Sequence, residues 1–111
     1  MKVYTFLTDG FETVEALAVI DILRRAGIEV ETVSITGNEQ VCSAQNITVK
    51  ADTLFKAQPV CKEDVLFLPG GPGHKQYNEC KPLLKLLEKH HAEGGRIAAI
   101  CAAPSILGHL G

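Results

Sequence analysis

The residues best suited to chemistry lie in the run RIAAICAAPS, from Arg96 to Ser105. Ile97 to Ile100 have the length and apolar character of a buried strand. Pro104 suits the first turn of a helix, because its φ is fixed and it has no amide proton. Cys101 would then lie on a tight strand-to-helix turn, a nucleophile elbow that projects a reactive atom beyond the sheet edge. Partial positive charge at the helix N-terminus favours a thiolate there.

The neighbours of Cys101 fit such a turn. Ala99 and Ala103 lie two residues before and two residues after it, where a bulky side chain would clash with nearby backbone. The alternative is a small hydrophobic cysteine that only closes a buried strand. The flanking alanines and Pro104 favour the reactive interpretation, so we predict a nucleophile elbow at Cys101.

Carboxylates gather where the first predicted helix begins, at Asp9, Glu12 and Glu15. A carboxylate at a helix N-terminus stabilises the helix by itself, as a cap or as a partner of the helix dipole. The functional alternative makes Glu12 a general acid or base beside Cys101. Burial next to a thiolate disfavours a second negative charge, so a protonated Glu12 could donate to sulfur or relay a substrate proton.

A glycine-rich loop, PGGPG, follows another apolar strand. The N–H groups of Gly70 and Gly71 could form an anion-binding nest, and the Gly71 N–H paired with that of Ala102 could stabilise an oxyanion. The alternative is a plain turn built from Gly and Pro. His74 is the histidine nearest this predicted site, and no partner base for Cys101 can be named from the sequence.

Strands and helices alternate along the chain. We expect strands at 2–8, 28–35, 64–68 and 97–100, helices at 12–26 and 82–93, a hairpin from 41–43 and 47–51, and an irregular stretch at 52–62 with one helical turn at 53–57. In the first helix, the residues expected to face the core are Val14, Leu17, Ala18, Ile22, Leu23 and Ala26.

Right-handed crossovers and strands without a polar face predict a mostly parallel sheet with helices on both sides. We therefore predict one α/β domain over residues 1–111, a three-layer sandwich with a small β-hairpin. Such sheets carry their chemistry at the carboxyl ends of the strands. The loops at 9–13 and 69–74 and the elbow at Cys101 should therefore meet at one edge.

Composition restricts the classes of function. With 46% hydrophobic residues, a net charge of −2, four Phe, two Tyr and no Trp, the chain has no basic stripe for nucleic acid. It lacks a membrane-length apolar run and a signal peptide, so we expect a cytoplasmic protein without a membrane partner. No metal-ligand spacing and no phosphate-binding motif is present, so we expect neither a metal nor a cofactor. The four cysteines show no C-x-x-C pair and should be free thiols.

Three motifs together resemble the ThiJ/PfpI family: GFETVEA at 10–16, LPGG at 68–71 and AAICAAP at 98–104. DILRRAG at 21–27 also resembles the first helix of that family, and the match spans the whole chain. The resemblance implies a flavodoxin-like fold within the class I glutamine amidotransferase-like group.

The resemblance also implies roles for individual residues. Cys101 corresponds to the easily oxidised nucleophile, Glu12 to the carboxyl that contacts its sulfur, and Gly71 with Ala102 to the oxyanion-binding amides. The implied activity is a cofactor-free glyoxalase or deglycase that acts on methylglyoxal-like aldehydes or on glycated amines and thiols. The alternatives are an oxidative-stress sensor or holding chaperone that uses oxidation of Cys101, or a protease or amidotransferase-like relative.

The resemblance further implies a homodimer and a longer polypeptide. Family members continue well beyond the position of Gly111 with further strands, helices, part of the dimer contact and often a histidine near the cysteine. We therefore expect a missing or separate C-terminal segment, because one sheet edge and one face of the predicted core would otherwise be uncovered.

Overall fold

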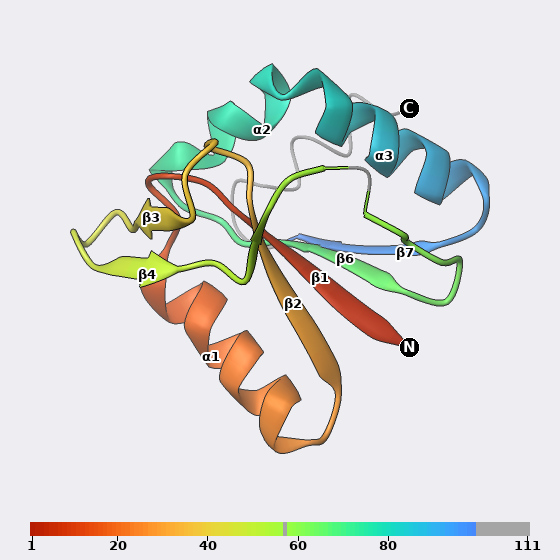
Figure 1. Cartoon of the computed structure of the whole chain (residues 1–111), viewed down its shortest axis with the longest axis horizontal. Coiled ribbons are helices and arrows are strands. Elements are labelled where there is room, and N and C mark those ends of the chain that lie inside the picture. The colour runs from red at the N-terminus through yellow and green to blue at the C-terminus, as the bar shows by residue number, and fades with distance from the viewer. Residues whose placement is uncertain (57, 100–111) are drawn as a thin grey trace.

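The computed structural model describes residues 1–56 and 58–99, which form an α/β sandwich around one parallel sheet (Figure 1). Helix α1 lies on one face of the sheet, and α2 and α3 lie on the other. The elements are β1 (Lys2–Leu7), α1 (Thr13–Arg25), β2 (Glu29–Ser34), β3 (Gln40–Cys42), β4 (Thr48–Lys50), β5 (Thr53–Leu54), β6 (Val65–Leu68), the 3-10 helix η1 (Pro72–His74), α2 (Lys75–Glu79), α3 (Lys81–Ala92) and β7 (Arg96–Ala99).

The sheet has the strand order β5-β2-β1-β6-β7, and every pair in it is parallel. The central strand, β1, pairs with β2 on one side and with β6 on the other, so Val3 aligns with both Val30 and Val65. The β3–β4 pair forms a separate antiparallel ribbon. The predicted three-layer architecture and the predicted hairpin are both confirmed.

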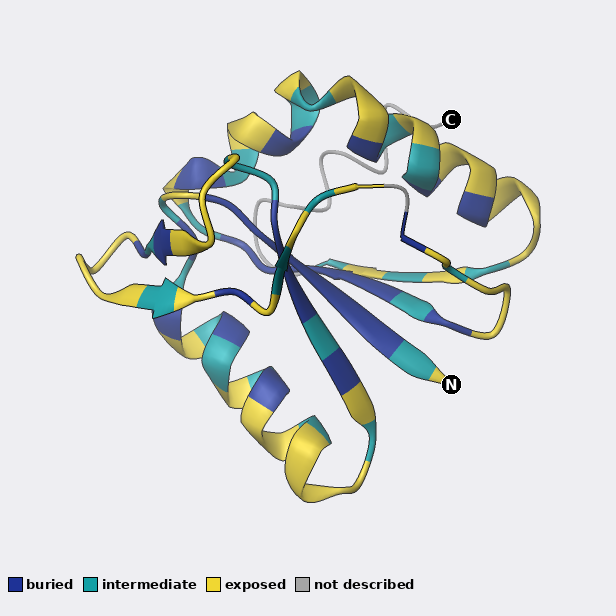
Figure 2. Cartoon of the chain, in the orientation of Figure 1, coloured by how far each residue is buried: buried dark blue, intermediate teal, exposed yellow. Residues whose placement is uncertain are grey.

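Alternate residues of β1 supply the cores on the two faces of the sheet (Figure 2). Tyr4 and Phe6 point to the side of α2 and α3, where they join a cluster with Leu83 and Leu87 of α3. Val3 points to the side of α1 and packs with Ile20. A strand buried on both faces needs apolar residues at consecutive positions, which explains why β1 lacks the alternation of a half-exposed strand.

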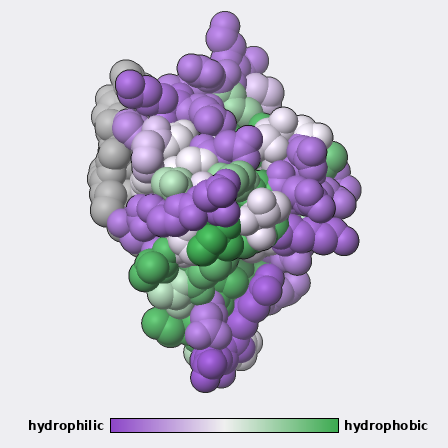
Figure 3. Space-filling model, turned by 90° about the vertical axis from the view of Figure 1, so that its left-hand side faces the viewer, coloured by the Kyte–Doolittle hydropathy of each residue, from purple (hydrophilic) through white to green (hydrophobic). Residues whose placement is uncertain are grey.

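The predicted buried face of α1 is right for Leu17 and Leu23, which are half-buried and pack against the core, and wrong for the other four residues, which are exposed: Val14, Ala18, Ile22 and Ala26. The buried residues are Thr13, Ala16 and Ile20, whereas Val14 is 72% exposed and Ile22 is 64% exposed. Apolar residues extend around most of this helix, so periodicity alone allowed two inward faces. Val14, Ala18 and Ile22 lie four residues apart as an exposed apolar line, which we call the α1 stripe. Figure 3 shows apolar surface gathered on this side of the molecule.

Residues 53–54 form an edge strand rather than the predicted helical turn. Thr53 and Leu54 of β5 pair with the end of β2. The pairing begins at Asp52, whose N–H donates to the Thr32 hydroxyl and whose carboxylate accepts from the Thr32 N–H, at 2.8 and 2.9 Å. A strand of two residues has no readable periodicity, so only its tertiary partner reveals it. Position 57, the end of the predicted turn, lies outside the described residues.

Helix α2 was not predicted, because its sequence KQYNE has no apolar repeat. One fully buried side chain anchors it: the Tyr77 hydroxyl donates to the carbonyl of Phe6 at 2.8 Å and lies 3.3 Å from that of Pro69. Burial raises the pKa of Tyr77 far above its usual value, so this hydroxyl stays protonated as a donor. Tyr77 therefore connects the ends of β1 and β6. None of the described helices is long and apolar enough to cross a membrane.

At the opposite edge of the sheet, His90 is 3% exposed near the end of α3. Its Nε2 donates to the carbonyl of Asp64 at 2.9 Å, because a carbonyl can only accept. Gly95 follows the helix and lies so close to the imidazole that a Cβ at position 95 would overlap the His90 ring. The turn from α3 into β7 therefore depends on the absence of a side chain at Gly95.

We predict that Gly95→Ala lowers the free energy of unfolding by about 1–3 kcal/mol, because the added methyl overpacks a buried ring. Urea denaturation would measure the change. The matched control is the same substitution in a His90→Ala background, where the space is vacated and the cost should fall to a few tenths of a kcal/mol. An equal cost in both backgrounds would show that the ring contact is not the cause.

Candidate functional site

Two loops that leave neighbouring strands meet at the carboxyl edge of the sheet, as the sequence predicted. The first follows β1 at residues 9–12, and the second follows β6 at residues 69–74. The N–H of Glu12 donates to the carbonyl of Gly70 at 2.8 Å, and the N–H of Gly73 donates to the carbonyl of Gly10 at 3.0 Å. Reciprocal main-chain hydrogen bonds therefore hold the two loops together.

The glycines of the second loop are required by this contact. A Cβ at Gly71 would lie 2.5 Å from the carbonyl oxygen of Gly10 and 2.6 Å from the nitrogen of Glu12, and one at Gly73 would overlap the carbonyl of Asp9. Gly71 also has a φ of +122°, which other residues rarely adopt. These glycines therefore allow a close approach of loop to loop, and any oxyanion role of Gly70 and Gly71 adds to it.

The β3–β4 hairpin holds the first loop from its other side. The carbonyl of Cys42 accepts from the N–H of Gly10 at 2.8 Å, and the N–H of Cys42 donates to the carboxylate of Asp9 at 3.0 Å. Ala44 donates to the carbonyl of Phe11 at 2.8 Å. The loop at 9–12 is therefore fixed between the hairpin and the glycine loop, which is a rigid setting for a functional side chain.

Glu12 occupies the N-cap position of α1, but its side chain makes no capping hydrogen bond. Gln45 of the hairpin caps the helix instead, since its Oε1 accepts from the N–H of Thr13 at 3.1 Å and from the Thr13 hydroxyl at 2.8 Å. The amide nitrogen of Gln45 donates to Glu12 Oε2 at 3.2 Å. The capping role that could have accounted for Glu12 is thus filled by another residue.

Glu15 is the second carboxyl at this edge, in the first turn of α1. Its Oε1 is shielded from solvent. The sequence predicts the chemical role for Glu12, with Glu15 only among the nearby carboxylates, because nothing in the sequence distinguishes the solvent exposure of the two. A shielded carboxylate near a helix start is a candidate for proton transfer, so Glu15 joins Glu12 in the candidate site.

His74 belongs to the loop at 69–74, and its side chain is hydrogen-bonded to the backbone of that loop. Its Nδ1 lies 3.1 Å from the carbonyl of Gly71 and donates to it, which leaves Nε2 as the remaining polar atom of the ring. The N–H of His74 also donates to the Gly71 carbonyl at 3.0 Å. His74 therefore stabilises the conformation of the glycine loop at the point where Gly71 meets Glu12.

The strand that leads to the predicted nucleophile ends at this edge. β7 runs parallel to β6, and Ala99 aligns with Leu68, the residue immediately before the PGG turn. Cys101 and Ala102, with the rest of the predicted elbow, lie outside the described residues. The elbow and its oxyanion-binding amides therefore remain predictions. Among the described residues, Glu12, Gly70, Gly71 and His74 form one continuous group through their hydrogen bonds and close contacts.

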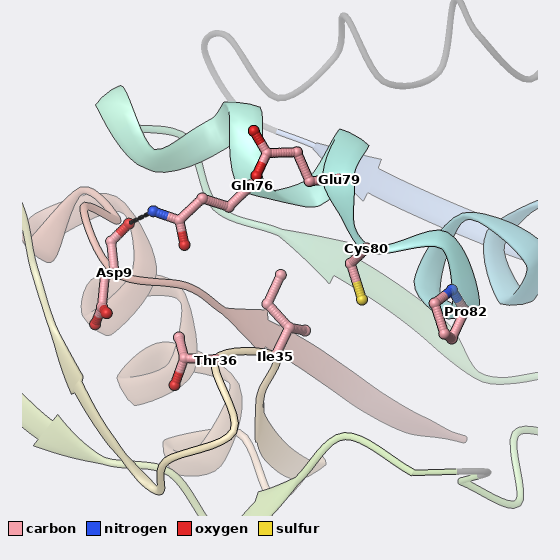
Figure 4. A pocket seen from close by; sticks show the side chains of 7 residues that line it. All are labelled: Asp9, Ile35, Thr36, Gln76, Glu79, Cys80 and Pro82. Atoms are coloured by element: carbon pink, nitrogen blue, oxygen red, sulfur yellow. Dashed lines mark hydrogen bonds between the residues drawn. The ribbon is translucent and has the colours of Figure 1, made fainter.

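An open cavity of about 780 Å³ lies beside this group, between the ends of β1 and β2 and helix α2 (Figure 4). At one end of the cavity, the side-chain nitrogen of Gln76 donates to the carbonyl of Asp9 at 3.2 Å. The side-chain oxygen of Gln76 accepts a hydrogen bond from the Thr8 hydroxyl. This cavity could not be predicted from the sequence, because helix α2 was not predicted. Its lining residues are Asp9, Ile35, Thr36, Gln76, Glu79, Cys80 and Pro82.

Within residues 1–56 and 58–99, no group of three or more His, Cys, Asp or Glu side chains is arranged to hold a metal ion. The three described cysteines, Cys42, Cys61 and Cys80, are free thiols. Cys61 is exposed, and the other two are half-buried. The polar groups at the sheet edge are therefore carboxylates, amides and one imidazole, a set suited to proton transfer and anion binding.

Comparison with known proteins gives concordant results. "Protein DJ-1 homolog B" of Arabidopsis thaliana and "Protein dj-1beta" of Drosophila melanogaster are each 38% identical over 106 residues, which is 95% of this chain but 24% and 57% of those proteins. "Glutathione-independent glyoxalase DJR-1.2" of Caenorhabditis elegans is 32% identical over 96 residues, 86% of this chain and 51% of that protein.

Solved structures show the same similarity. The structure described as "Toxoplasma gondii DJ-1, oxidized" superposes with a TM-score of 0.91 at 37% identity and covers 99% of this chain and 61% of its own. Drosophila melanogaster DJ-1beta superposes with a TM-score of 0.90 at 34% identity, over 98% and 59% of the two chains. The chain thus spans about three-fifths of these structures. The model of the DJ-1/PfpI family matches residues 1–111, and the chain belongs to that family.

Proposed function

We propose that this chain carries the reactive centre of a cysteine-dependent, cofactor-free glyoxalase or deglycase that acts on methylglyoxal-like aldehydes or their adducts. The main support is the register of β7 with β6, because it directs the chain that leads to Cys101 toward the edge where Glu12 and Gly71 are in contact. The name of the Caenorhabditis elegans relative, a glutathione-independent glyoxalase, agrees with this activity.

In the proposed reaction, the thiolate of Cys101 forms a bond to the aldehyde carbon of methylglyoxal. The carbonyl oxygen takes the negative charge, and the N–H groups of Gly71 and Ala102 stabilise it before protonation to a hemithioacetal. A carboxylate then moves the proton from the former aldehyde carbon to the neighbouring carbon, which produces a thioester of lactate. Water hydrolyses the thioester and releases lactate and the thiol, so no redox cofactor is consumed.

Two carboxyls compete for the proton-transfer role. The proposal gives the proton-transfer role to Glu12. Because Gln45 caps α1, the Glu12 side chain is not needed as a cap and is available for chemistry. The shielded Oε1 of Glu15 supports the alternative, because a carboxylate away from water is better matched to carbon-bound protons than a solvated one. The two assignments share the thiol chemistry and differ only in the base.

We predict that Cys101→Ala abolishes formation of lactate from methylglyoxal, because no other group supplies the covalent intermediate. Of Glu12→Gln and Glu15→Gln, the variant that removes the base should lose about 10²–10⁴-fold in kcat, since the isosteric amide cannot take a proton. The other should lose less than about tenfold.

The exposed His91 provides the matched control, because His91→Gln should leave turnover unchanged. Circular dichroism and thermal unfolding of each variant would confirm that the fold is retained. Full turnover in Cys101→Ala would contradict the proposal, and full turnover in both glutamine variants would contradict the assignment of the base to this edge.

A second candidate function is oxidative sensing through Cys101, and one observation favours it: the similar structure from Toxoplasma gondii is described as oxidized. A thiolate at a helix N-terminus would be oxidised more readily than ordinary thiols. Free cysteines also agree with a reducing compartment, so we retain the proposal of a cytoplasmic location.

We predict that sub-stoichiometric peroxide oxidises Cys101 before Cys42, Cys61 and Cys80, as measured by mass spectrometry of the labelled peptides. Cys61 is the internal control, because it is an exposed thiol that peroxide can reach. Oxidation of Cys61 at the same rate as Cys101 would contradict a special reactivity of Cys101.

We also propose a homodimer, with the α1 stripe as part of the contact. Val14 and Ile22 are large apolar side chains more than 60% exposed on one helix, an arrangement more typical of interfaces than of free surface. We predict that Val14→Lys with Ile22→Lys shifts the protein to monomer in light-scattering chromatography, because burying two ammonium groups is costly. Leu54→Lys, on the edge strand β5 and outside the α1 stripe, should leave the mass unchanged.

A further inference from the structure

A second cavity, with no part in the proposed site, lies between α3 and the chain that follows β5. It has a volume of about 600 Å³, and no residue of the loops at 9–12 and 69–74 lines it. The chain after β5 runs beside α3 in Figure 1, far from the β3–β4 hairpin. The lining residues are Phe55, Lys56, Gln58, Pro82, Lys85, Leu86 and Lys89, which we call the α3 groove.

The charges of the α3 groove all have one sign. Lys85 and Lys89 are one helical turn apart on α3, and Lys56 faces the groove from the chain after β5. All three are exposed, and none takes part in the ion pairs formed between described residues. Among the described residues, no carboxylate lines the groove. A chain of net charge −2 therefore concentrates three positive charges around one cavity.

Lys89 lies in the last turn of α3, where a positive charge favours the helix, but its spacing from Lys85 brings two like charges together. Like charges four residues apart destabilise a helix by about 0.2–0.5 kcal/mol. Glu88 lies on the same helix but does not line the groove or pair with these lysines in the described contacts. A cluster of like charges that has no counter-charge among the described residues is typical of a surface that binds an anion.

The floor of the groove is apolar and already ordered. Phe55 and Leu86 are half-buried and pack against the core on the α3 side of the sheet. The Phe55 ring is held against Phe6, with centroids 6.0 Å apart and planes tilted by 54°. A ligand would therefore meet a formed hydrophobic surface, without the entropy cost of ordering it.

Gln58 fixes the lip of the groove. It is 7% exposed, and its side-chain nitrogen donates to the carbonyl of Leu54 at 3.0 Å. Its side-chain oxygen accepts from the N–H of Lys56 at 3.1 Å. Both ends of this amide are therefore used to hold the backbone that carries Lys56. The recognition groups left to the groove are the three ammonium groups and the apolar floor.

We infer that the α3 groove binds a small organic anion with a flat apolar body and a carboxylate or phosphate head. The lysines would hold the head as point charges, and the body would lie over Phe55, Leu86 and Pro82. The volume is within the range of small-molecule sites, about 300–1,000 Å³. This site is independent of the proposed chemistry at Cys101, because the two share no residue.

The test is titration of the ¹⁵N-labelled chain with 1-naphthyl phosphate, 1-naphthoate and neutral 1-naphthol, followed by amide chemical shifts. We expect the two anions to shift the amides of Phe55, Leu86 and Lys89, with 1-naphthol at least about tenfold weaker because it lacks the charge. Whichever anion binds more tightly identifies the head group. Binding should weaken as salt is raised.

Lys85→Glu with Lys89→Glu should reduce affinity for both anions by at least about tenfold, since both substitutions reverse a charge on an exposed helix face. Lys50→Glu, an equally exposed lysine on the hairpin, should change it less than about twofold. The double variant should turn over methylglyoxal at the same rate as the wild type. The binding test is therefore independent of whether the proposed enzyme activity is found.

Four outcomes would overturn the inference. One is naphthol binding as tightly as the anions, which would remove the role of charge. Another is inorganic phosphate binding as tightly as naphthyl phosphate, which would remove the role of the apolar floor. The third is hexaglutamate binding more tightly than either naphthyl anion, which would assign the groove to an acidic protein segment. Shifts confined to other parts of the chain would also contradict it.

Discussion

The candidate site depends on the main-chain contact between the loops after β1 and β6. The carbonyls of Gly70 and Gly10 accept from Glu12 and Gly73, and the backbones are so close that a side chain at Gly71 could not be accommodated. Main-chain bonds carry no side-chain entropy cost, so they hold Glu12 and the glycine amides at a fixed separation. Any reacting atom at this edge would meet a preformed set of groups.

Two further elements reinforce that contact from opposite sides. The hairpin pairs with the first loop through Cys42 and caps α1 through Gln45, while Tyr77 of α2 connects the ends of β1 and β6 from beneath. Each of these supports is itself anchored by a fully buried side chain, Val41 in the hairpin and Tyr77 in α2. Short elements outside the sheet therefore hold the loops in position because they are packed into the same cores that stabilise the fold.

The two chemical regions of the molecule differ in charge and in construction. The sheet edge presents carboxylates and main-chain amides, which suit proton transfer, whereas the α3 groove presents ammonium groups above an aromatic floor. The first arises from loops that must contain glycine, and the second from a regular helix whose lysines repeat every four residues. They can therefore vary independently without loss of the fold.

The sequence alone determined the parallel sheet, the hairpin, the long helices and the convergence of the loops at Glu12 and Gly71, because apolar runs, glycine turns and crossover chirality are local or topological properties. The inward face of α1, the strand β5, the helix α2 and the burial of Glu15 were decided by tertiary structure. Apolar residues surround α1, so only its packing on the sheet selects Ala16 and Ile20 over Val14 and Ile22. β5 and α2 are too short to show a hydrophobic period. β5 is fixed by the hydrogen bonds between Asp52, just before it, and Thr32 of β2, and α2 is fixed by the hydrogen bond from Tyr77 to the carbonyl of Phe6.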